Sequence, residues 1–152
     1  GELYAKSVAV FDTYYKSHDQ YLEDHRDGYQ TVGDIAYVDD EGYYFICDRK
    51  KDMIITGGVN VYPAEIENVL DDHPQVAEVA VFGIPDEEWG EVVCAVIVCM
   101  DNLNEKELIN FAKERLSGPK VPKKVFIRSD LPKTGSGKVL KRELKQWVQE
   151  NS

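Results

Sequence analysis

The sequence has 152 residues, of which 43% are hydrophobic and 30% are charged, as in a globular domain rather than a disordered chain. Its formal net charge of -10 argues against general nucleic-acid binding, which needs clustered lysines and arginines. The longest apolar run, Val92 to Met100, is too short to span a membrane, and no signal-peptide pattern is present. We therefore expect a cytoplasmic protein without a transmembrane segment, and peripheral contact with a membrane stays open.

The first fifty residues are predicted to be rich in β-structure. Strands are expected at Glu2–Phe11, Tyr29–Val38 and Tyr43–Arg49. The acidic, glycine-containing stretch Asp39–Gly42 predicts a hairpin loop between the last two strands. The polar stretch Tyr14–Arg26 predicts a loop or a short helix.

A charged cluster, Asp48–Asp52, interrupts the apolar pattern and predicts a domain boundary, with residues 1–50 in one domain and 51–152 in the next. Beyond it, Thr56–Asn60 contains two adjacent glycines, which predict a tight turn with positive φ or a close backbone approach.

Residues 51–152 predict a compact α+β domain of a few strands packed with about three helices. Pro63 is expected to begin the first helix and Asn104 to cap the second, with Glu107 as its capping partner and Gly118 at its end. A third helix follows Lys138. The expected strands are Val76–Ile84, Val92–Met100 and Lys124–Arg128, the second being central in the sheet because it is almost wholly apolar, and an acidic loop is expected at residues 85–91.

The three cysteines have no C-x-x-C spacing and the three histidines are scattered, so we expect reduced core thiols and no metal site. Charge is distributed unevenly. Between Gly118 and Lys145 there are nine basic and two acidic residues, a local balance of +7 in an acidic protein. This asymmetry predicts a site for an anionic ligand, and a solvated basic face is the alternative.

Lys138 stands in the middle of this basic region, directly after Gly135-Ser136-Gly137. The stretch is not a Walker A loop, because the residue five before Gly137 is Pro132 and no hydroxyl residue follows the lysine. The pattern instead predicts a lysine on a flexible, exposed loop before an amphipathic helix, where it can deliver a cation to a phosphate. An exposed linker lysine is the alternative.

Three stretches, Gly33-Asp34, Asp48–Glu67 and Leu131–Leu144, resemble in order the C-terminal motifs of acyl-CoA synthetases. These enzymes belong to the adenylate-forming superfamily, together with luciferases and peptide-synthetase adenylation domains. The resemblance extends over essentially the whole chain. It implies an AMP-forming acid–thiol ligase that activates a carboxylic acid, fatty or aromatic, with Mg²⁺ and ATP to acyl-AMP and then transfers the acyl group to CoA.

The resemblance also implies residue roles. Lys138 matches the catalytic lysine, whose ammonium stabilises the charge that develops during adenylation. Asp34 resembles the ribose-binding aspartate and Arg49 the arginine that contacts the nucleotide. Lys51 matches the hinge about which the C-terminal domain swings, and Gly57 and Gly58 match the loop that lines the CoA channel.

Each role has a structural alternative. Asp34 suits a turn or a helix cap, Arg49 an ion pair with Asp48 or Asp52, and the two glycines a simple hairpin turn. One departure from the family is that Val32 stands where a threonine is usual, with Thr31 displaced by one position. Two acids that follow the glycine turn, Glu65 and Glu67, are expected to cap and solubilise a helix.

The phosphate-binding loop and acyl pocket of such enzymes lie in a large N-terminal domain, which is absent from these residues. We therefore expect residues 1–50 to be the β-rich end of that domain, the domain itself to be the main partner, and the fragment alone to be inactive. Two alternatives remain: an adenylation domain that loads a carrier protein, and a non-catalytic binding module of the same fold.

Overall fold

The strand β8 (Gly90–Cys99) is the element on which the larger part of the fold is built. The computed structural model describes residues 1–100 and 103–151, and the chain forms two units, Gly1–Lys51 and Asp52–Ser152. In the second unit most of β8 is buried, as its apolar sequence predicts for a central strand. It pairs with strands on both sides, which confirms the prediction.

The other strands of this unit are β5 (Ile54–Thr56), β6 (Val59–Val61), β7 (Val76–Asp86) and β9 (Lys124–Arg128). The sheet has the order β6-β5-β8-β7, and β9 pairs in parallel with β8 on the side that β5 also uses. The predicted acidic loop at residues 85–91 is wrong in extent, because β7 and β8 stay paired as far as Asp86 and Gly90. The Asp86 carboxylate accepts the N–H groups of Glu88 and Trp89, both at 3.0 Å, and so closes a tight turn that lets the ladder continue.

The helices of this unit are α2 (Pro63–Asp71), α3 (Glu105–Lys113), α4 (Lys141–Glu150) and the short 3₁₀ helix η2 (Gly118–Lys120). Proline at the first position of α2 and the Asn104–Glu107 capping box of α3 are confirmed. The second helix does not extend to Gly118, which instead begins η2. The proline that follows this glycine has no N–H to donate and suits the start of a new helix.

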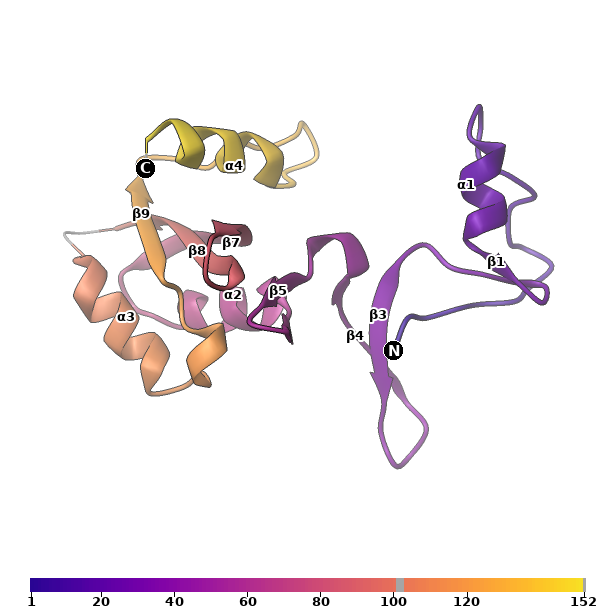
Figure 1. Cartoon of the computed structure of the whole chain (residues 1–152), viewed down its shortest axis with the longest axis horizontal. Coiled ribbons are helices and arrows are strands. Elements are labelled where there is room, and N and C mark those ends of the chain that lie inside the picture. The colour runs from indigo at the N-terminus through magenta and orange to yellow at the C-terminus, as the bar shows by residue number, and fades with distance from the viewer. Residues whose placement is uncertain (101–102, 152) are drawn as a thin grey trace. The chain divides into compact units, whose positions relative to one another are not determined.

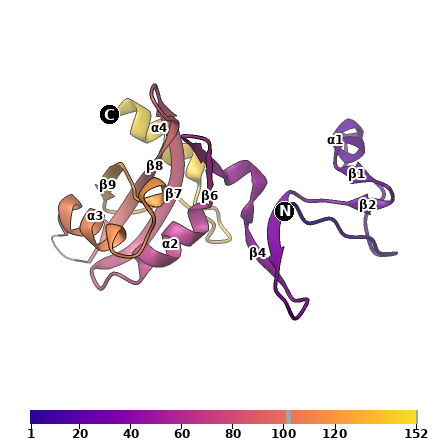
Figure 2. The ribbon, with the colours of Figure 1, turned by 60° about the horizontal axis from the view of Figure 1, so that its bottom comes forward.

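The sheet is covered on both faces, which gives three layers and confirms the α+β class. Figures 1 and 2 show α2 and α3 on one side of the strands and α4 on the other. The apolar side chains of β7 and β8 alternate between two cores. The α2 and α3 side buries Ile66, Leu70, Val81, Val93, Ala95, Ile97, Leu108 and Ala112. The α4 side buries Ala80, Phe82, Val92, Cys94, Val96, Leu131, Leu144 and Val148.

Burial at the second core has a chemical consequence for a thiol. Cys94 is fully buried in β8, and desolvation raises its pKa to about 12. The expected core position therefore holds for Cys94, whereas Cys47 and Cys99 are only partly buried.

The first unit contains α1 (His18–Glu23), β1 (His25–Arg26), β2 (Tyr29–Gln30), β3 (Asp34–Val38) and β4 (Tyr44–Arg49), followed by the 3₁₀ helix η1 (Lys50–Asp52). The short helix agrees with its prediction. The expected strand at residues 2–11 is wrong, since only isolated bridges form there, at Glu2 and Ala5. The expected strand at residues 29–38 is broken into β2 and β3, because Gly33 takes a left-handed φ of 80°.

The β3–β4 hairpin confirms the predicted loop at residues 39–42. The Asp39 carboxylate accepts the N–H groups of Glu41 and Tyr43, at 3.0 and 2.9 Å, and so fixes the turn. One face of the hairpin is exposed and aromatic, with the rings of Tyr37 and Phe45 stacked 5.0 Å apart.

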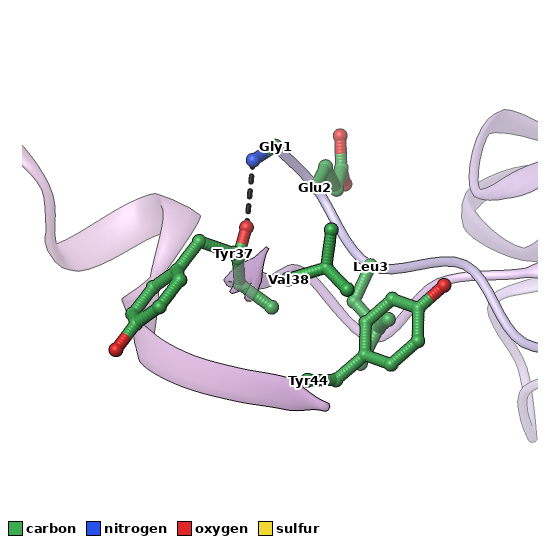
Figure 3. Close-up of a pocket in the computed structure, with 7 residues that line it drawn as sticks. Gly1, Glu2, Leu3, Tyr37, Val38 and Tyr44 are labelled. Carbon is green, nitrogen blue, oxygen red and sulfur yellow. Dashed lines mark hydrogen bonds between the residues drawn. The ribbon is translucent and has the colours of Figure 1, made fainter. Parts of the chain in front are cut away.

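A shallow hollow beside this hairpin is lined by the first three residues and by strand residues (Figure 3). The Gly1 nitrogen donates to the Ala36 carbonyl at 2.7 Å and so holds the segment against β3. None of the site residues predicted from the sequence lines this hollow.

Across residues 1–100 and 103–151, no helix combines the length and the apolar character needed to cross a membrane.

Replacing Leu144 should destabilise the second unit, because this side chain is fully buried between α4 and the sheet. We expect Leu144→Ala to lower the free energy of unfolding by about 2 to 5 kcal/mol, since the lost burial leaves a cavity. Urea unfolding followed by circular dichroism measures this. Gln149→Ala, on an exposed position of the same helix, should change stability by less than about 0.5 kcal/mol; equal effects of the two changes would show that α4 is not anchored as described.

Candidate functional site

Lys138 lies on an ordered turn between β9 and α4. The Thr134 N–H donates to the Lys138 carbonyl at 2.8 Å, and the Lys138 N–H donates to the Thr134 hydroxyl at 3.1 Å. Gly137 closes the turn with a φ of 84°, a left-handed conformation that strains other residues. Gly137 therefore has a conformational role, which the prediction of a flexible loop did not include.

The Lys138 side chain is exposed, and its ammonium makes no ion pair or side-chain hydrogen bond within the described part of the chain. The lysines on either side of it differ in this respect. Lys133 pairs with Glu78, and Lys141 pairs with Glu67 at 2.8 Å. The turn thus presents one uncompensated cation between two neutralised ones, an arrangement suited to an anionic group that approaches from outside.

Gly57 and Gly58 form the turn between β5 and β6, with φ values of 56° and 78°. The Gly57 N–H donates to the Trp89 carbonyl at 2.9 Å. A Cβ built on Gly57 would lie 2.7 Å from the Trp89 ring, so a side chain there would clash within this unit. The Trp89 ring in turn lies under the Lys123 ammonium, 3.9 Å from the ring centroid. Gly58 differs, because its Cβ position has no heavy atom within 4 Å.

The lysine turn and the glycine turn lie toward opposite edges of one sheet. β5 pairs with β8 at Thr56 and Gly90, whereas the lysine turn is tied to β7 and α2 through Glu78 and Glu67. Strands β5 and β7 are two strand spacings apart, roughly 10 Å. The two turns are also separated along the strands, since Glu78 is eight residues from Asp86, the partner of Gly90, or roughly 26 Å at 3.3 Å per residue.

The first unit brings Asp34 and Arg49 together as register partners of β3 and β4. Arg49 Nε lies 2.9 Å from Asp34 Oδ1, so the ion pair expected with Asp48 or Asp52 forms with Asp34 instead. The Asp34 side chain is 19% exposed and that of Arg49 is 49% exposed. The contact joins a single guanidinium nitrogen to a single carboxylate oxygen, and therefore orients both groups while leaving donors and an acceptor for a ligand.

The turn before Asp34 is held by the displaced threonine. The buried Thr31 hydroxyl accepts the Gly33 N–H at 3.0 Å, whereas the Val32 side chain is half exposed. In this chain the hydroxyl therefore supports the backbone that leads into Asp34.

Lys51 is the last residue of the first unit and is exposed. The preceding Lys50 is held in place: its N–H donates to the Gly33 carbonyl at 2.7 Å, and its ammonium pairs with Glu2 at 2.9 Å. Hydrogen bonding to Glu2, and then charge attraction by the same residue, raise the pKa of Lys50. The backbone is therefore pinned immediately before Lys51. Within the described residues, no group of three or more His, Cys, Asp or Glu side chains is arranged to hold a metal ion.

Two features of this geometry were missed from the sequence. The Asp34–Arg49 contact was not predicted, although the hairpin was, because a register shift between Ile35 and Ala36 decides which residues of the two strands are partners. The packing of Trp89 over Gly57 had no local signal, since it joins residues far apart in the sequence.

The second unit is a small domain that carries an exposed lysine turn and a glycine turn on one sheet. Its residues 65–138 match the family described as AMP-binding enzyme C-terminal domain. Over 150 residues the chain is 45% identical to 2-succinylbenzoate–CoA ligase of Bacillus cytotoxicus, covering 99% of this chain and 31% of that protein.

Solved structures agree. The o-succinylbenzoate CoA synthetase of Bacillus subtilis, in complex with its acyl-adenylate intermediate, is 39% identical with a TM-score of 0.89, over 95% of this chain and 30% of that one. ATP-bound MatB from Rhodopseudomonas palustris is 37% identical with a TM-score of 0.90, over 99% of this chain and 30% of that one. Residues 65–138 carry the AMP-binding enzyme C-terminal domain, and over nearly its whole length the chain is similar to acyl-CoA synthetases of the adenylate-forming superfamily. It spans about a third of the length of these relatives.

Substituting Gly137 should loosen the turn that carries Lys138. Gly137→Ala meets no steric obstacle but places a Cβ on a left-handed backbone, which costs about 1 kcal/mol or more. We expect faster hydrogen exchange at the Lys138 amide, measured by NMR. Gly135→Ala is the matched control, because Gly135 is equally open and lacks a positive φ. Unchanged exchange in both variants would contradict a conformational role for Gly137.

Proposed function

We propose that this chain forms the C-terminal part of an AMP-forming acid–thiol ligase. In the first half-reaction a carboxylate oxygen attacks the α-phosphorus of ATP, which arrives with Mg²⁺, and pyrophosphate leaves. In the second, the CoA thiol attacks the acyl carbon and AMP leaves. The observation that carries the proposal is the uncompensated Lys138 cation on an ordered turn between two paired lysines.

Lys138 is proposed to act in the first half-reaction. Two anions, the carboxylate and the triphosphate, must approach one another, and negative charge gathers on the phosphoryl oxygens in the transition state. An ammonium fixed near these oxygens lowers the barrier electrostatically without taking part in bond making. A lysine suits this role, because it is a compact point charge on a long stem.

Asp34 and Arg49 are proposed to contact the nucleotide. The Asp34 oxygens are suited to accept hydrogen bonds from two adjacent ribose hydroxyls, and the Arg49 nitrogens to donate to ribose or phosphate oxygens. Their mutual contact at 2.9 Å supports this proposal, because it holds both groups in one orientation before a ligand arrives.

Gly57 and Gly58 are proposed to line the path of the CoA thiol arm. Because this turn and Lys138 lie toward opposite edges of one sheet, we infer that a fixed orientation of the second unit cannot present both to one reaction centre. The second unit is therefore proposed to swing between the half-reactions about Lys51, which directly precedes it.

The proposal also has to name the carboxylic acid that is activated and the molecule that accepts the acyl group. The first acid to test is 2-succinylbenzoate, because a relative at 45% identity is named as its CoA ligase; fatty acids form the comparison panel. A carrier protein in place of CoA, or a non-catalytic module, remains an alternative.

Since both ATP and CoA are present in the cytoplasm, we propose that the enzyme acts there. These 152 residues alone are expected to form no acyl-AMP.

In the full-length enzyme, Lys138→Ala should slow adenylation by about 10²- to 10³-fold, the usual cost of losing one electrostatic stabiliser of a transition state. Pyrophosphate release measures this step. Thioester formation from supplied acyl-AMP and CoA should stay within about twofold, because Lys138 acts only in the first step. Lys106→Ala, which removes an exposed lysine of α3, should alter neither reaction. Full adenylation activity without Lys138 would favour the non-catalytic module.

The converse result is expected for Gly58→Leu. Its side chain would enter open space, where the thiol arm is proposed to pass, so thioester formation should fall at least about tenfold while adenylation changes little. Gly42→Leu is the control for backbone strain, because Gly42 is also open and has a φ of 89° in a turn outside the site. Equal loss of both half-reactions in Gly58→Leu would count against the channel assignment.

A further inference from the structure

The segment that carries Lys138 is fastened at both ends by carboxylates from other elements. Before the turn, Lys133 pairs with Glu78 of β7. After it, Lys141, the first residue of α4, pairs with Glu67 of α2 at 2.8 Å. Both partners lie far from the turn in sequence. The position of the turn on the domain is therefore set by α2 and β7.

Glu67 is the more constrained of the two carboxylates. The same oxygen, Oε1, that contacts Lys141 also accepts the Val81 N–H at 2.8 Å. This N–H belongs to a fully buried residue of the edge strand β7, and α2 itself is anchored by the buried side chains of Ile66 and Leu70. The Glu67 carboxylate is thus fixed relative to the sheet before it meets a lysine.

The link from Glu67 to Lys138 is short. Lys141 is three residues from Lys138, and between them the Leu140 N–H donates to the Pro132 carbonyl at 2.8 Å. The turn is further closed by the Lys133–Val139 bridge. Few freely rotating backbone bonds therefore separate the fastened lysine from the free one. A misplacement of about 1 Å in a catalytic group can lower the reaction rate about 10²-fold. A contact that fixes the position of Lys138 can therefore affect the rate measurably.

We propose that Glu67 is a positioning residue for adenylation, which acts through Lys141 to hold Lys138 where the phosphates arrive. The proposal rests on the function proposed for Lys138. The Lys141 and Glu67 side chains are 26% and 24% exposed, so solvent partly screens the pair, and we expect the effect in one half-reaction rather than in folding.

The test uses Glu67→Gln in the full-length enzyme. The glutamine keeps an oxygen for the Val81 N–H but loses the charge that holds Lys141. We expect adenylation to fall about tenfold, with thioester formation from supplied acyl-AMP within about twofold. Lys141→Gln, which breaks the same pair from the other side, should give the same pattern.

Glu65→Gln is the matched control. Glu65 lies on the same helix and also pairs with a lysine, Lys120, at 2.6 Å, but this pair does not involve the Lys138 segment. It should leave adenylation unchanged. A loss as large as that of Glu67→Gln would overturn the proposal, as would equal loss of both half-reactions in Glu67→Gln.

A double-mutant cycle separates this inference from the proposed function of Lys138. If Glu67 acts through Lys138, the double variant Glu67→Gln, Lys138→Ala should adenylate no more slowly than Lys138→Ala alone. A further tenfold loss in the double variant would overturn the inference alone. Unimpaired adenylation in Lys138→Ala would overturn the proposed function, and the inference with it.

Discussion

Burial of β8 on both faces is the constraint on which the second unit depends. An apolar strand in the middle of a sheet needs a hydrogen-bonded neighbour on each side and a layer of side chains above and below. β7 completes one side, β5 and β9 share the other, and the helices supply the two covering layers. The lysine turn and the glycine turn, which are proposed to act in this unit, lie at the rim of this buried centre.

The separation of the two turns along the rim bears on the proposal that one domain serves two half-reactions. The sheet holds the lysine turn and the glycine turn apart, so the two turns cannot approach one another without rearranging the strands between them. The proposed reorientation of the whole unit would change only a few backbone dihedrals near Lys51, whereas rearranging the sheet would break the core. The pinning of Lys50 against the first unit gives such a motion a fixed origin.

The sequence predicted those parts of the structure that depend on neighbouring residues. The capping box at Asn104, the proline start of α2 and the loop at Asp39 are local, and all three are confirmed. Contacts between residues far apart in the sequence could not be predicted. The second partner of Glu67 and the ring over Gly57 depend on how α2, β7 and the β7–β8 turn meet in space, which no local pattern specifies. The sequence prediction also made one strand too long, where Gly33 breaks the backbone between β2 and β3, and two strands too short, where the Asp86 turn lets the β7–β8 ladder continue.

The outer side of β7 is an edge of the sheet, and an unprotected edge is a surface at which one molecule can add a strand to another and begin to aggregate. Two features reduce this risk here. Pro85 has no N–H to offer, and the N–H of Val81 is already taken by Glu67. The glutamate proposed to order the lysine segment therefore also occupies a hydrogen-bonding position that a strand added to this edge would need.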